Sequence, residues 1–237
     1  MSFTGPSQST HPDTYIGKIP ALRFSGSQNF RQSERRDLIR QGLRPNPKGR
    51  KTNIGYRVRE HLTETEMDQL LAALKRNRHG HRDWLIGLLI YRHGLRVSEA
   101  CDLRWDDIDL GKRTIVVRRL KGSTDSSHYL ERDEHKALGD LWRANPANGV
   151  MSGYVFVNER GHPFGRMGIG RMIERAGEAA GLPFPVHVHM LRHSTGYALA
   201  ARGMDTRRLQ HYLGHASITN TVRYTAMSPE PFKDSCK

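Results

Sequence analysis

The sequence predicts a mainly α-helical fold with a small antiparallel β-sheet, an α+β domain preceded by a basic arm. Apolar residues recur at helical spacing in several stretches after residue 62, whereas one stretch near residue 114 is β-branched and extended. The first 60 residues are rich in Ser, Gly, Pro, Arg and Lys and have too little apolar periodicity for a core. We therefore expect an arm at 1–60, a folded domain at 61–228 and a tail at 229–237.

The first half of the domain has clear helix signals. Thr63 and Glu66 form a capping-box pattern, which predicts a helix from residue 64. A second apolar helix is expected over about 83–93, ending at Gly94. The stretch from Arg96 to Gly111 also has short-helix character.

The residue pattern then changes from helical spacing to that of an extended strand. Residues 114–120 predict a strand, Lys121-Gly122-Ser123 supplies turn chemistry, and 127–130 predicts the returning strand, with a third short strand at 154–157. Helical patterns resume at 133–144 and 166–180. The last part, 188–227, is expected to form three short helices broken at Gly203 and Gly214.

Charge narrows the functional class. The chain has 38 Lys and Arg against 24 Asp and Glu, a formal net charge of +14. Such a chain attracts polyanions, and nucleic acid is the leading candidate because phosphate neutralisation releases condensed counterions. The longest apolar run, 84–91, is too short to span a membrane, and no signal peptide is apparent, so we expect a cytoplasmic protein. Cys101 and Cys236 lie far apart, which favours reduced thiols.

Six side chains form a set suited to phosphoryl transfer. This chemistry requires an aligned nucleophile, cations around the phosphate oxygens and a proton donor for the leaving oxygen. The candidates, in chain order, are Arg96, Lys121, His189, Arg192, His215 and Tyr224.

The segments HGLRVSEACDLRW, HMLRHSTGYALA and LGHASITNTVRYT resemble the signature boxes of the tyrosine recombinase family. Each box alone is weak, but their order is specific, and the nine residues from His215 to Tyr224 are similar to the family's spacing. The resemblance implies the catalytic-domain fold of that family and a site-specific recombinase or integrase that uses no cofactor. Its partners would be double-stranded DNA, three further copies in a homotetramer, and an accessory DNA-bending protein.

The resemblance also implies a role for each residue. Tyr224 would attack a DNA phosphate and form a 3′-phosphotyrosyl link, while Arg96 and Arg192 grip the phosphate oxygens through bidentate forks. His189, three residues before Arg192, would share its helix face and help to deprotonate the tyrosine, and His215 would donate to a phosphate oxygen. Lys121 would protonate the departing 5′ hydroxyl.

Two supporting assignments complete this set. Glu99, one helical turn after Arg96, is expected to be a buried structural partner. The segment that follows Lys121 departs from the family's more basic and regular second strand, so Lys112 is kept as an alternative to Lys121.

Other functions stay open at this point. A type IB topoisomerase shares the tyrosine, arginine and histidine chemistry, and a degenerate recombinase could be a DNA-binding regulator. Because the 60 residues before the domain are few and polar, we expect them not to build the N-terminal helical domain common in the family. Closely spaced histidines suggest a metal site, but neither a Cys pair nor an H-E-x-x-H pattern accompanies them, so no metal is predicted. These histidines are His187, His189 and His193, with His211 and His215.

Overall fold

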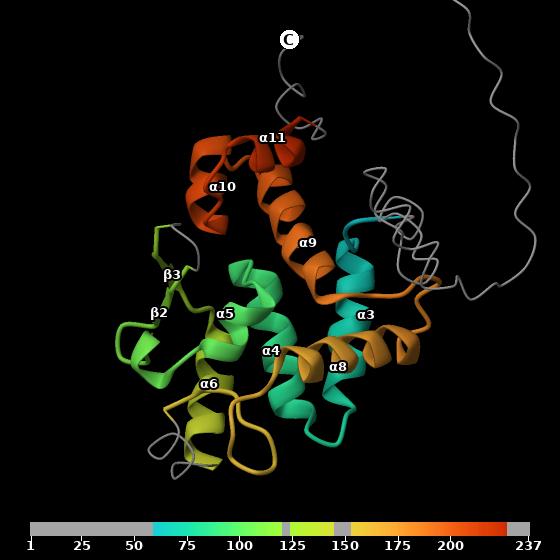
Figure 1. The fold of residues 1–237 in the computed structure, drawn as a ribbon, viewed down its shortest axis with the longest axis vertical. Coiled ribbons are helices and arrows are strands. Elements are labelled where there is room, and N and C mark those ends of the chain that lie inside the picture. The colour runs from blue at the N-terminus through green and yellow to red at the C-terminus, as the bar shows by residue number, and fades with distance from the viewer. Residues whose placement is uncertain (1–58, 120–123, 145–152, 227–237) are drawn as a thin grey trace, which may run out of the picture. The chain divides into compact units, whose positions relative to one another are not determined.

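The computed structural model describes residues 59–119, 124–144 and 153–226. The predicted arm up to residue 58, the turn that contains Lys121, and the tail lie outside these residues. The described residues form a mostly helical domain with a three-stranded antiparallel sheet in the order β1-β2-β3, which confirms the predicted fold class (Figure 1).

Four long helices build the main core. They are α3 (Glu64–Lys75), α4 (Gly80–His93), α8 (Arg166–Ala179) and α9 (Val188–Ala201). The capping box of Thr63 and Glu66 is present at the start of α3, and α4 ends at Gly94 as predicted but begins three residues before the expected 83. Helix α4 contacts α3, α9 and α6 (Arg132–Ala144), so its apolar side chains are buried on nearly all sides.

The sheet differs from the prediction in its third strand. Strands β2 (Thr114–Val117) and β3 (Ser126–Tyr129) pair as expected, with Ile115 opposite His128. The third member is β1 (Ile108–Asp109), which follows α5 (Val97–Asp102) and the 3-10 helix η1 (Trp105–Asp107).

The prediction of a third strand at 154–157 was therefore wrong, and the helical character predicted up to Gly111 holds only as far as Asp107. Tyr154 and Val157 make only isolated bridges, to Arg104 and Pro163. Strand β1 forms because the chain turns tightly back onto β2. The Asp109 carboxylate accepts the Lys112 N–H at 2.8 Å, and Arg113 adopts a positive φ of 54°.

The C-terminal part follows the prediction of three helices closely. After α9, Gly203 and Gly214 have φ angles of 82° and 62°, and they separate α9, α10 (Thr206–Leu213) and α11 (Thr219–Thr225). Both short helices contact α9 and each other, and Figure 1 shows them together at one end of α9.

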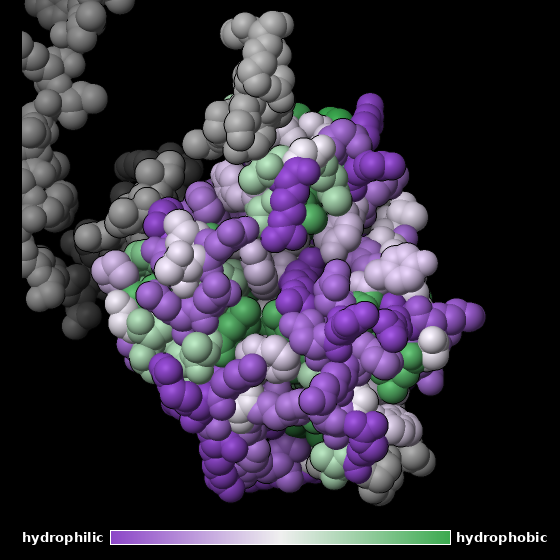
Figure 2. Space-filling model, turned by 180° about the vertical axis from the view of Figure 1, so that it is seen from behind, coloured by the Kyte–Doolittle hydropathy of each residue, from purple (hydrophilic) through white to green (hydrophobic). Residues whose placement is uncertain are grey.

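One face of the described domain is polar (Figure 2). Figure 2 shows a face that is mostly hydrophilic, with apolar side chains in small patches. Of the helices in the described ranges, none is long and apolar enough to cross a membrane.

Candidate active site

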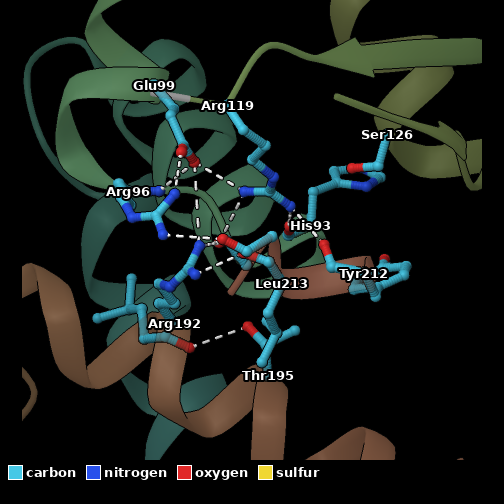
Figure 3. Close-up of polar contacts among 12 residues, drawn as sticks. His93, Arg96, Glu99, Arg119, Ser126, Arg192, Thr195, Tyr212 and Leu213 are labelled. Atoms are coloured by element: carbon cyan, nitrogen blue, oxygen red, sulfur yellow. Dashed lines mark hydrogen bonds and ion pairs between the residues drawn. The ribbon is translucent and has the colours of Figure 1, made fainter. Parts of the chain in front are cut away.

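Three arginines from separate parts of the chain converge on one buried carboxylate (Figure 3). Glu99 Oε1 lies 2.6 Å from Arg96 Nη1, and Glu99 Oε2 lies 2.7 Å from Arg119 Nη1 and 3.9 Å from Arg192 Nη1. Burial alone would raise the pKa of Glu99, but the positive charge of Arg119 and the hydrogen bonds from Arg96 hold it below its usual range. Three guanidinium groups around one carboxylate leave an excess of two positive charges, which suits an anion.

The same three arginines hold the C-terminal end of α10. Three consecutive carbonyl groups each accept a hydrogen bond from a different arginine: Tyr212 from Arg119, Leu213 from Arg192 at 2.5 Å, and Gly214 from Arg96 at 3.0 Å. The last carbonyls of a helix carry its partial negative charge and lack partners within the helix, so cations are favoured there. The arrangement fixes the segment that leads directly into His215.

Two glycines explain why the arginines can approach so closely. Gly94 has a φ of 59°, and its carbonyl accepts from both Arg192 and Arg119. A Cβ atom at Gly94 would lie 2.5 Å from a Leu213 methyl group, and one at Gly214 would lie 2.7 Å from Arg119 Cδ. The glycines of HGLR and LGH are thus required by backbone conformation and by close packing.

Tyr224 is buried, with 1% of its surface exposed, and its hydroxyl lies 2.7 Å from Nδ1 of His193. Burial raises the pKa of Tyr224 to about 12, although the positive charges of Arg192 and Arg223 act in the opposite direction. Burial, reinforced by nearby cationic groups, lowers the pKa of His193 to about 3. The pair therefore rests as a neutral phenol against a neutral imidazole at neutral pH.

His215 lies between the arginines and the tyrosine. Its ring is stacked on that of Tyr224, with 6.2 Å between centroids, and its Nδ1 lies 2.9 Å from Thr221 Oγ1. Burial first, and then the charges of Arg192 and Arg96, lower the pKa of His215 to about 4. A neutral His215 that is engaged through Nδ1 can offer its other ring nitrogen as a donor.

The structure thus brings together five of the residues singled out from the sequence: Arg96, Glu99, Arg192, His215 and Tyr224. His189 is exposed and meets the ring of His193 edge-on, with centroids 4.4 Å apart. Lys121 lies outside the described residues, and Lys112 sits at the exposed β1–β2 turn, 3.5 Å from Asp109.

Two site residues were missed by sequence reasoning. His193 directly follows Arg192 in HMLRHS, and that adjacency was the available signal. Arg119 follows the β-branched residues 114–117 and Arg118, and a charged residue with no exposed side-chain surface is unusual. Within the described ranges, no three His, Cys, Asp or Glu side chains converge as ligands for a metal ion. Cys101 is buried, and burial raises the pKa of its thiol to about 11, so it is not an activated nucleophile.

The fold and a tyrosine flanked by histidines and arginines define the catalytic domain of a tyrosine-type site-specific recombinase. Comparison with known proteins agrees. The phage integrase family model matches residues 60–230, so the chain belongs to the phage integrase family.

Curated relatives cover most of this region. The type 1 fimbriae regulatory protein FimE of Escherichia coli strain K12 is 42% identical over 177 residues, which cover 73% of this chain and 89% of FimE. The tyrosine recombinase XerA of Thermococcus kodakarensis is 36% identical, over 71% of this chain and 58% of XerA. The match covers most of the length of FimE. XerA, in contrast, has a further part that its match with this chain does not include.

Solved structures show the same fold. The crystal structure of XerA recombinase has a TM-score of 0.64 and 28% identity, and the match covers 86% of this chain and 72% of that one. The XerH site-specific recombinase bound to its difH substrate in a pre-cleavage complex has a TM-score of 0.65 and 23% identity, over 76% of this chain and 54% of XerH.

Proposed function

We propose that this recombinase cuts double-stranded DNA by attack of the Tyr224 hydroxyl on a scissile phosphate. The attack forms a 3′-phosphotyrosyl link and releases a 5′ hydroxyl, and the 5′ hydroxyl of a partner strand then reverses the step. The observation that carries the proposal is the excess of positive charge around Glu99, placed next to a tyrosine whose hydroxyl contacts a histidine.

The roles of the arginines follow from their exposure. The Arg96 side chain is 31% exposed, so it can meet a phosphate directly, whereas Arg192 is 2% exposed and lies deeper. Both keep guanidinium N–H groups that can stabilise charge on the pentacoordinate phosphorus. Burial and the neighbouring guanidiniums lower the pKa of Arg192, but an arginine stays protonated at neutral pH.

The Tyr224 proton needs an acceptor before the oxygen can attack. His193 Nδ1 is in contact with the Tyr224 hydroxyl, and the His189 ring contacts the His193 ring. We assign His193 the role of accepting the proton and His189 the role of passing it on to solvent. His215 would donate to a phosphate oxygen, and Lys121 would protonate the departing 5′ oxygen, which becomes the free 5′ hydroxyl.

The reaction as proposed requires neither ATP nor a metal ion. A phosphodiester is exchanged for a phosphotyrosine of similar energy, so rejoining conserves the bond energy, and the arginines supply the positive charge.

We further propose that four copies of the chain act on two synapsed DNA sites, with an accessory DNA-bending protein. The net charge of +14 supports DNA binding. The solved XerH structures contain difH DNA, which supports the same partner here. The protein would then reside in the cytoplasm, and its DNA-bound molecules would lie on the nucleoid.

The test is a covalent adduct on DNA. Supercoiled plasmid that carries flanking DNA from the protein's own locus is incubated with the chain, quenched with detergent and probed for protein-linked 3′ ends. Wild type should form the adduct and Tyr224→Phe should form none, because phenylalanine has no nucleophilic oxygen. Tyr129→Phe is the matched control, since Tyr129 is 82% exposed on β3 and should keep wild-type yield.

The products separate the remaining alternatives. Four-way junctions or recombined molecules support the proposal. Relaxed circles alone would indicate a topoisomerase, and tight salt-sensitive binding with no adduct would indicate a DNA-binding regulator.

A further inference from the structure

We infer that Arg119 is a positioning residue for strand cleavage: it neutralises Glu99 and fixes the end of α10, so that Arg192 and His215 are held ready for the phosphate. This inference rests on the proposed function, because it concerns the same phosphate site. It assigns Arg119 no contact with DNA.

The ion pair with Glu99 sets Arg119 apart from Arg192, which is also buried. The Arg119 side chain has 0% exposed surface, against 2% for Arg192 and 31% for Arg96. The charge of Arg119 is matched by Glu99 Oε2 at 2.7 Å, whereas Arg192 lies 3.9 Å from that oxygen. The Arg119 guanidinium is already committed to Glu99, to the carbonyl of Tyr212 and, at 3.4 Å, to the carbonyl of Gly94. Its own main-chain N–H donates to Asp125 at 2.7 Å, so the residue is fixed at both ends.

The charge pattern around Glu99 shows what Arg119 does for Arg192. Glu99 Oε2 is 2.7 Å from Arg119 but 3.9 Å from Arg192. The closer hydrogen bonds of Arg192 go to two neutral carbonyls, those of Gly94 and Leu213. Because Arg119 occupies the carboxylate, the charge of Arg192 remains available to a phosphate. Without Arg119, Arg192, at 3.9 Å, is the guanidinium that Oε2 would attract.

Arg119 also joins the sheet to the segment before His215. Its stem packs against Gly214, where an added Cβ would meet Arg119 Cδ at 2.7 Å. Tyr212, whose carbonyl it binds, stacks on His128 of β3 at 4.0 Å between centroids and donates its hydroxyl to the carbonyl of Arg92 at 2.8 Å. Removing the guanidinium would therefore loosen α10 from β2 and β3, and the orientation of His215 depends on α10.

A fully buried arginine is not an efficient way to stabilise a core. Apolar residues in place of a buried ion pair are often neutral or stabilising. In addition, Arg119 Nε is buried and has no hydrogen-bond acceptor among the described residues. The need to position Arg192 and His215 accounts for a buried arginine at residue 119.

The experiment compares three purified full-length variants with wild type: Arg119→Met, Arg119→Lys and, as the control, Arg143→Met. Arg143 also pairs with a carboxylate, Asp140 at 2.5 Å, but its side chain is 71% exposed on α6. Single-turnover cleavage is measured on two DNA substrates, one with a normal scissile phosphodiester and one with a neutral methylphosphonate there. DNA affinity and the thermal midpoint are recorded for each variant.

We expect Arg119→Met to bind DNA within about twofold of wild type but to cleave the phosphodiester about 100-fold more slowly, the scale for a misplaced catalytic group. The loss on the methylphosphonate should be at least tenfold smaller, because a neutral phosphorus centre depends less on Arg192. Arg119→Lys keeps the charge but cannot reach both Glu99 and the α10 carbonyls, so a loss of about tenfold is expected. Arg143→Met should match wild type.

Three results would overturn the inference: wild-type cleavage by Arg119→Met, an equal loss on both substrates, or wild-type cleavage by Arg119→Lys. The lysine variant decides the matter if the methionine variant does not fold. Absence of an adduct with wild type would instead count against the proposed function.

Discussion

The described domain has two hydrophobic clusters of very different size, and Tyr224, the proposed nucleophile, is in the smaller one. The large cluster joins α3, α4, α8 and the start of α9, and includes Leu74 and Leu89 with no exposed surface. The small cluster has Ala200, Leu209, Leu213 and Tyr224 as its buried members. Burial of apolar surface therefore fixes the scaffold far more strongly than it fixes Tyr224.

Polar contacts supply much of what holds α10 and α11 in place. Asp205 caps α10 by accepting from the N–H groups of Arg207 and Arg208, and Thr206 is hydrogen-bonded to Thr225 of α11 at 3.0 Å. Together with the three arginines on the α10 carbonyls, these contacts make the position of Tyr224 dependent on charge and geometry. Such a region should open at a lower free energy than the core.

The largest expected effect comes from truncating the same residue type in each cluster. Leu89→Ala should lower the free energy of unfolding by about 2–5 kcal/mol, because it leaves a cavity in the closely packed main core. Leu209→Ala, also at 0% exposure, should cost less and act locally. Urea unfolding gives the global values, and amide hydrogen exchange should show faster opening of α10 and α11 alone in Leu209→Ala. Uniformly faster exchange across α3 and α4 in that variant would show that the clusters unfold as one unit.

A smaller effect is expected at Gly196, where α9 faces the ring of Tyr224. A Cβ atom there would lie 2.7 Å from Cε1 and Cζ of Tyr224, so the ring must move. Overpacking of this kind costs about 1–3 kcal/mol, and because α11 is the weaker element, the displacement should fall on Tyr224. Gly196→Ala should therefore lower single-turnover cleavage more than it lowers the thermal midpoint.

The control for that substitution is Gly170→Ala on α8, where nothing lies within 4 Å of the added Cβ. Alanine is the better helix former, so this variant should gain about 0.5–1 kcal/mol with unchanged cleavage. Equal cleavage by wild type and Gly196→Ala would mean that the pocket of Tyr224 adapts without cost.

The sequence predicted the scaffold well because its signals are local. The capping box at Thr63 and the glycine stops at Gly94, Gly203 and Gly214 depend on neighbours within a few residues. Strand β1 was missed since two residues carry no periodicity, and Ile108 becomes a strand residue only by pairing with Ile115.

The site was predicted in part, for a related reason. Motif spacing singled out Arg96, Arg192, His215 and Tyr224, but which histidine meets Tyr224 depends on tertiary packing. His189 and His193 are four residues apart and share one face of α9, so the position at which α11 packs along α9 selects between them. His193 rather than His189 contacts the hydroxyl. The role of Arg119 depends on its contacts with Glu99 and Tyr212, and both residues are distant from it in sequence.

The smallest expected effect is on the pH dependence of stability, and it tests the polar character of the Tyr224 region. Burial lowers the pKa of His193 in the folded chain to about 3, from an ordinary value of 6.5. As the pH falls through 6.5, the unfolded chain binds a proton at this histidine while the folded chain does not, so stability present at higher pH is lost. Between pH 7.5 and 5.5 the loss from His193 should be about 1 kcal/mol. Urea unfolding at both pH values should show His193→Gln losing less stability than wild type by this amount. The same loss in both proteins would mean that His193 reaches solvent, and that Tyr224 is held by packing rather than by this contact.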